Sequence, residues 1–112
     1  MIKDILTASG VEYAQGRFVR TPAGTYAVYF DDIEVDGADP VRTAASALPG
    51  VYKHTVTIEL YELTTDDVIE TAIEAELNAR GLPWTKQDRY WLHDLQRYQV
   101  IYEFTYYNKR RT

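Results

Sequence analysis

An acidic segment between residues 31 and 39 has the spacing that comes closest to a metal site. Counted from its second residue, it places carboxylates at the first, third and fifth positions of a calcium-binding loop and glycine at the sixth. These residues are Asp32, Glu34, Asp36 and Gly37. The twelfth position, which should supply a bidentate carboxylate, is Thr43 and cannot do so. We therefore interpret the segment as a solvated hairpin end, with a weak cation site or a catalytic metal centre as alternatives.

Other residues that could catalyse a reaction are few. The two histidines, His54 and His93, are too few for most zinc sites in a chain without cysteine. Neither Ser9 nor Ser46 has the glycine-flanked context of a nucleophile elbow, and no glycine cluster follows a strand and opens a helix. Carboxylate pairs such as Glu59 with Glu62 are typical of exposed faces. The sequence therefore predicts no catalytic residue, no cofactor and no resident metal.

Length and charge restrict the remaining possibilities. A chain of 112 residues fits a single domain over residues 1–112. Its formal net charge of −5 argues against a general nucleic-acid binder, which needs a basic surface to release counterions. The first residues include an acid and no long apolar run, so we expect neither a signal peptide nor a membrane anchor, and synthesis in the cytoplasm.

Residue periodicity predicts the elements that must position these side chains. Helices are expected over residues 2–8, ended by Gly10, and from a capping box at 64–67 to about residue 80, ended by Gly81. On the second helix we expect Glu70 and Glu74 to face water. Strands are expected over residues 11–17, 25–34, 51–63, 85–92 and 98–107.

Short connections between consecutive strands predict antiparallel hairpins, and two helices can cover only one face of such a sheet. The expected fold class is therefore α+β: a single antiparallel sheet of four to five strands with two helices packed on one face. The other face must be covered by something else, and we expect further copies of the same chain.

The last predicted strand, residues 98–107, is apolar or aromatic on both faces. Tyrosine is suited to interfaces because it has an apolar ring and a polar tip. We therefore expect Tyr102, Tyr106 and Tyr107 to lie at a subunit interface. A second group of candidate residues is acidic. They are Asp31, Asp32, Glu34, Asp36, Asp39 and Glu59.

Four strings in succession resemble a family of small siphophage and prophage proteins. The strings are Gly16-Arg17-Phe18, Tyr26–Phe30 followed by Gly37-Ala38-Asp39, Thr57–Glu62 and Tyr98–Phe104. The family comprises tail-completion or tail-terminator proteins and head-tail joining proteins, and the resemblance spans nearly the whole chain.

This resemblance implies a structural virion protein that is not an enzyme. It implies a homo-oligomeric ring, commonly a hexamer, that caps the tail tube and docks to the head-side connector. We expect the acidic group to face the axial channel of this ring, through which DNA passes without specific binding. Three alternatives remain open. They are a head-completion or connector subunit, a metal-dependent hydrolase that uses the acidic segment, and a monomeric adaptor that binds a peptide by strand addition.

Overall fold

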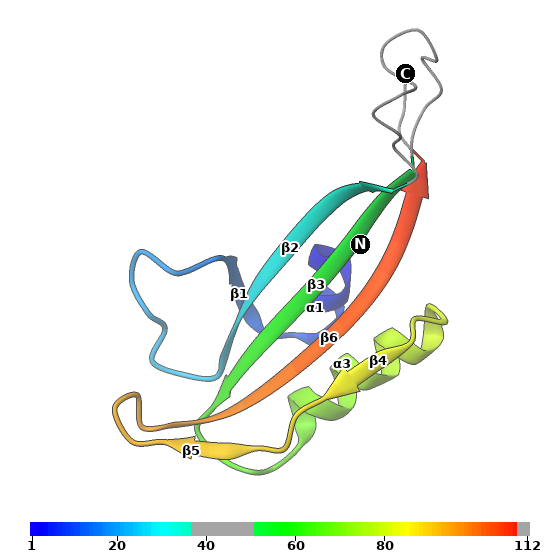
Figure 1. Cartoon of the computed structure of the whole chain (residues 1–112). Helices are drawn as coiled ribbons and strands as arrows, with labels where there is room; N and C mark the ends of the chain where they lie inside the picture. Colours follow the sequence, from blue (N-terminus) through cyan, green and yellow to red (C-terminus); the bar gives the residue numbers. More distant parts are fainter. Residues whose placement is uncertain (37–50, 110–112) are drawn as a thin grey trace, which may run out of the picture.

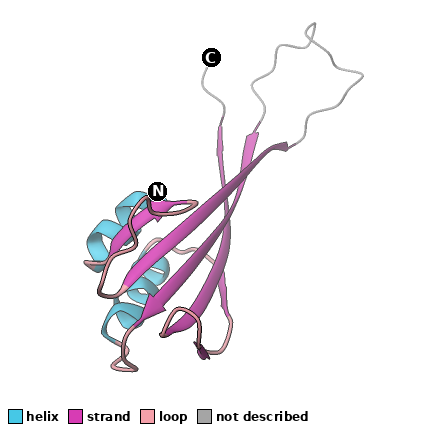
Figure 2. Ribbon diagram, turned by 90° about the vertical axis from the view of Figure 1, so that its left-hand side faces the viewer, coloured by secondary structure: helices cyan, strands magenta, loops and turns pink. Residues whose placement is uncertain are grey.

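The computed structural model describes residues 1–36 and 51–109 and has an α+β architecture. In chain order the elements are α1 (Ile2–Ser9), β1 (Glu12–Gln15), β2 (Tyr26–Asp36), β3 (Val51–Glu62), α3 (Val68–Ala79), β4 (Trp84–Lys86), β5 (Tyr90–Leu92) and β6 (Arg97–Lys109). Both helices lie on the same side of one strongly twisted sheet (Figures 1 and 2). The predicted α+β class, with two helices on one face, is confirmed.

The sheet has six strands in the order β1-β2-β3-β6-β4, and β5 also pairs with β6. All pairs are antiparallel except β1 with β2, which are parallel. The expected sheet of four to five antiparallel strands was therefore wrong in number and in one pair. Residues 16–25 account for the parallel pair, because this connection is long enough to return the chain to the starting end of β1 (Figure 1).

The single strand predicted over residues 85–92 is split in two. Both β4 and β5 pair with the outer edge of β6, with β4 opposite residues 102–104 and β5 opposite residues 97–99. Between them the chain leaves the edge, and the side chains of Lys86 and Arg89 reach the acids of α3. Ion pairing to the helix thus accompanies the break in the strand.

The core lies between the sheet and the two helices, as the alternation in the sequence predicts. One face of β3 and β6 meets apolar stripes of α1 and α3, since strand side chains alternate and helical ones recur every three to four residues. The core residues with no exposed surface are Ile5, Leu6, Ala27, Val56, Ile58, Leu60, Ile73, Leu77, Val100 and Tyr102.

The opposite face of the sheet is partly covered near β1. Tyr26, on this face, is only 5% exposed because the ring of Phe18 meets it edge-on at 5.5 Å and Tyr61 stacks on it at 5.0 Å. The connection over residues 16–25 therefore shields one end of the face, and no described segment covers the other end.

Helix α3 ends as predicted but begins differently. The predicted capping box is wrong: Asp67 is the N-cap residue, has a φ of 65° and makes no side-chain capping bond. Instead, the carboxylate of Asp66 accepts a bond of 3.3 Å from the backbone N–H of Val68. The side chain of Asp67 instead pairs with Arg89, which lies between β4 and β5.

We expect Gly81→Ala to lower the free energy of unfolding by about 1 kcal/mol, because Gly81 has a φ of 68° and an added Cβ is strained there. No heavy atom within 4 Å would meet that Cβ, so the cost is backbone strain alone. Urea unfolding followed by circular dichroism measures the difference. The control is Gly24→Ala, where φ is ordinary and space is open; an equal loss there would contradict this account.

Candidate subunit interface

The distal half of the sheet consists of three strands that nothing else flanks in the described residues. Strand β1 pairs with β2 only as far as Tyr29, and β4 pairs with β6 only as far as Phe104. The three central strands continue in register to the end of β6. Figure 2 shows them extending past both helices. We call this part, residues 30–36, 51–57 and 105–109, the ribbon.

The two outer edges of the ribbon carry unpaired backbone groups. On the β1 side the carbonyl of Tyr29 accepts from the N–H of Gly16, and on the β4 side the carbonyl of Ile101 accepts from the N–H of Gln87. Every second residue of a strand directs its N–H and C=O to the same edge. The backbone groups of Ile33 and Tyr107 therefore point outward, at edges where the described chain supplies no partner strand. Such edges are templates for further strand pairing.

The ribbon also exposes large apolar side chains. Ile33 is 56% exposed, Tyr107 54% and Phe30 39%. Ile33 lies on the face that carries the helices, beyond their reach, whereas Phe30 and Tyr107 lie on the opposite face. Exposed apolar groups gathered on one projecting element are typical of a surface that meets another protein.

Of the three predicted interface tyrosines, only Tyr107 is well exposed. The prediction for Tyr102 is wrong, because its side chain is fully buried under α3 and its hydroxyl donates a 2.6 Å bond to Glu74. Tyr106 is partly buried on the same face. Its ring stacks on His54, with the ring centres 4.4 Å apart.

The predicted channel-facing acids do not form a single row. Residues 31–36 belong to β2 and pair with β3, so the described part of the acidic segment is regular strand. Asp32, Glu34 and Glu59 share the open face, and Asp31 lies on the opposite face. Asp36 ends the strand, and Asp39 lies outside the described residues. In the described part of the chain, no three His, Cys, Asp or Glu residues are grouped to hold a metal ion.

A hydrogen-bonded histidine joins the three strands of the ribbon. His54 on β3 is 7% exposed; its Nδ1 lies 3.0 Å from the Asp31 carboxylate on β2, and its Nε2 lies 3.0 Å from Oδ1 of Asn108 on β6. Residue spacing does not reveal this contact, because the three residues are brought together only by the strand register. The network fastens the ribbon across all its strands, so His54 is structural here.

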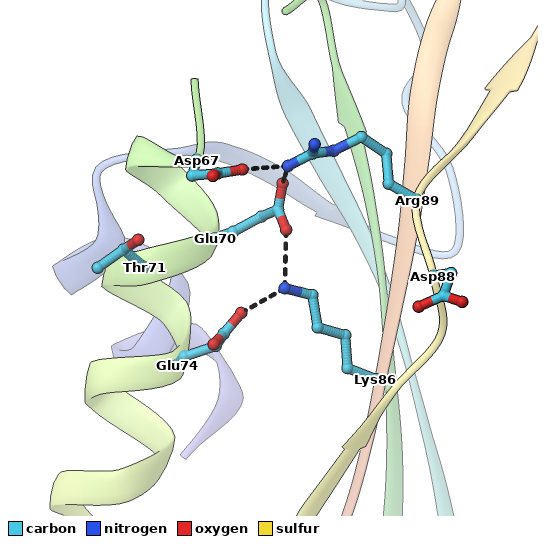
Figure 3. Close-up of a pocket in the computed structure, with 7 residues that line it drawn as sticks. All are labelled: Asp67, Glu70, Thr71, Glu74, Lys86, Asp88 and Arg89. Carbon is cyan, nitrogen blue, oxygen red and sulfur yellow. Dashed lines mark hydrogen bonds and ion pairs between the residues drawn. The ribbon is translucent and has the colours of Figure 1, made fainter. Parts of the chain in front are cut away.

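A second polar site lies between α3 and the β4–β5 edge (Figure 3). Lys86 bridges Glu70 at 2.9 Å and Glu74 at 2.7 Å. Arg89 pairs with Glu70 and Asp67, and its Nε lies 3.9 Å from Glu62 at the end of β3. We call these six residues the charged cluster. Glu70 and Glu62 are only 3% and 2% exposed, so the expectation that Glu70 faces water was wrong.

The two buried acids of the cluster titrate in opposite directions. Burial, together with a hydrogen bond to Glu70 and its charge, raises the pKa of Glu62 to about 8. Burial alone would raise the pKa of Glu70 as well. Hydrogen bonds from Glu62, Arg89 and Lys86 outweigh burial and lower it to about 2. At neutral pH, Glu62 therefore holds the proton and Glu70 is the ionised partner of the two cations.

The charged cluster borders a hollow of about 450 Å³ lined by Asp67, Glu70, Thr71, Glu74, Lys86, Asp88 and Arg89. Glu70, Glu74 and Asp67 each have a basic partner within the cluster. Such pairing is typical of ion pairs that stabilise the fold, because a catalytic site must leave a reactive group free to contact substrate. The cluster therefore fastens α3 to the β4–β5 edge.

Comparison with protein-family models and with curated proteins gives no match for this chain. Within residues 1–36 and 51–109, no helix is long and apolar enough to cross a membrane.

Proposed function

We propose that this chain is a structural subunit that assembles into a closed ring at the tail-to-head junction of a phage or prophage virion. The observation that carries the proposal is the ribbon, which projects beyond the helices, exposes apolar side chains and has two edges that no strand of residues 1–36 and 51–109 pairs with. A subunit whose charged cluster is paired internally and whose ribbon edges have no partner strand among the described residues is suited to assembly rather than to catalysis.

A ring requires two different patches on each subunit that meet head to tail. The ribbon supplies two such patches, because its β2 edge and its β6 edge differ in sequence and lie on opposite sides of β3. This supports a cyclic assembly over an isologous dimer, in which one patch would have to meet itself.

The open face of the sheet supports a role in DNA passage. It carries Asp32, Glu34, Glu59 and Glu103. If this face points toward the ring axis, its carboxylates repel the phosphate backbone and let DNA slide through without binding. The ring would then cap the tail tube and dock to the head-side connector, as the resemblance in the sequence implies.

Assembly is tested by native mass spectrometry of the purified chain, with negative-stain images to show whether the multimer encloses an opening. We expect a multimer of the 12.9 kDa chain that dissociates to monomer in Ile33→Ser/Tyr107→Ser, because this variant removes the exposed apolar groups of both ribbon edges. The matched control is Val19→Ser/Leu95→Ser, which changes two exposed apolar residues outside the ribbon and should leave the multimer intact.

A chain that stays monomeric from micromolar to millimolar concentration would contradict self-assembly of the free protein. A connector subunit on the head side would use the same ribbon, so its partners must be distinguished separately. Co-purification of the ring with tail-tube subunits supports the tail-side role, and co-purification with portal complexes supports the head-side alternative.

A further inference from the structure

We propose that neighbouring copies join by parallel strand pairing, with the outer edge of β2 in one copy against the outer edge of β6 in the next. This inference rests on the self-association proposed above and specifies its interface. The ribbons of all copies then form one continuous sheet.

The direction of pairing follows from the sheet topology. Strands β2 and β6 are both antiparallel to β3, so they run in the same direction. Rotation about an axis along the strands preserves that direction. A β2 edge that meets the β6 edge of a rotated copy must therefore pair in parallel.

The backbone and the faces are compatible with this pairing. In a parallel pair of strands, a residue whose backbone N–H and C=O point to the neighbouring strand bonds to the two residues on either side of the residue directly opposite. The side chains of Ile33 and Tyr106 both lie on the helix-bearing face. The backbone N–H and C=O groups of Ile33 point to the outer edge of β2, and those of Thr105 and Tyr107, on either side of Tyr106, point to the outer edge of β6. When Ile33 stands opposite Tyr106 of the next copy, the helix-bearing face of one sheet continues into that of the other.

Charge favours this pairing over a twofold one. The outer part of β2 carries Asp31, Asp32 and Glu34, so pairing of two β2 edges would set carboxylates against one another. The facing stretch of β6, residues 105–108, has no acid, and the sequence continues with Lys109, Arg110 and Arg111. The parallel arrangement therefore sets the β2 carboxylates against a stretch of β6 that carries no acid.

The chain contains no cysteine, so any disulfide that forms between two introduced cysteines identifies residues that are close together at the interface. We would combine Thr105→Cys on β6 with one of three changes on the same open face of β2: Phe30→Cys, Asp32→Cys or Glu34→Cys. Within one copy, Asp32 and Thr105 are both opposite Thr55 of β3, so they lie at the same height along the strands. Phe30 and Glu34 test a register shifted by two residues in either direction. A disulfide within one copy is excluded because β2 and β6 are two strand spacings, about 9–10 Å, apart, beyond the roughly 7 Å that a disulfide spans.

Mild oxidation should convert most of at least one double variant into a reducible ladder of covalent multimers, while each single-cysteine variant stays uncrosslinked. A covalent dimer of any single β2 variant would show β2 against β2 and overturn the inference. A covalent dimer of Thr105→Cys would show β6 against β6 and do the same. A native multimer without crosslinks in all three double variants would overturn the inference but leave the ring proposal standing, whereas a monomer throughout would overturn both.

Discussion

Arg89→Met is expected to lower the free energy of unfolding by about 1.5–3 kcal/mol, the usual range for hydrogen bonds to a charged group, because Arg89 is 25% exposed and Lys86 still pairs with Glu70. Arg89 lies against Glu70, which is 3% exposed, and near Glu62, which is 2% exposed. Methionine keeps much of the apolar stem but leaves the negative charge of Glu70 to Lys86 alone. Urea unfolding at neutral pH, at a concentration where wild type and variant have the same oligomeric state, measures the loss.

The matched control is Arg80→Met at the C-terminal end of α3. Arg80 pairs with Glu76 at 3.1 Å, and both side chains are about one-third exposed. An exposed pair of this kind contributes at most about 1 kcal/mol. Equal losses at both positions would show that burial of the charged cluster does not set the cost, and a loss below about 1 kcal/mol at Arg89 would contradict its role as the lock between α3 and the β4–β5 edge.

Stability should fall as the pH rises from about 4.5 to about 8. The pKa of Glu62 is about 8 in the folded chain against an ordinary 4.5, so in this range the folded state holds a proton that the unfolded state has lost. The contribution of Glu62 is complete below pH 4.5 and lost as the pH passes 8. Glu70, with its pKa lowered from 4.5 to about 2, acts oppositely, and its contribution is lost progressively as the pH falls from 4.5 to about 2. Mildly acidic solution is therefore the most stabilising for this pair.

Glu62→Gln tests the source of this pH dependence. The amide imitates the protonated acid and cannot ionise, so the decline of stability between pH 5 and 9 should flatten and the variant should exceed wild type at pH 9. Thermal unfolding at pH 5, 7 and 9 measures this. Glu12→Gln, which changes an exposed acid of β1, is the control and should keep the wild-type decline. An unaltered decline in Glu62→Gln would assign the pH dependence to other groups.

Local pattern was sufficient to predict most elements of this fold. The alternation over β2, β3 and β6 identified three strands whose bounds agree with the structure within a few residues, and Gly10 and Gly81 end the two helices at positive φ. These features depend on neighbours in sequence, because side-chain periodicity and glycine conformation are properties of short segments.

The sites were determined by contacts that pattern does not encode. Periodicity placed Tyr102 and Phe104 on one face of β6, but only the docking of α3 decided that Tyr102 is core and that Tyr107, on the other face, is exposed. In the same way Glu70, a helical acid expected in water, is buried because Lys86 and Arg89 arrive from a distant edge of the sheet. The sequence by itself determined which residues share a face. The tertiary structure decided which faces and edges are covered, since burial depends on elements far apart in the chain, and it left the ribbon edges without a partner strand among the described residues.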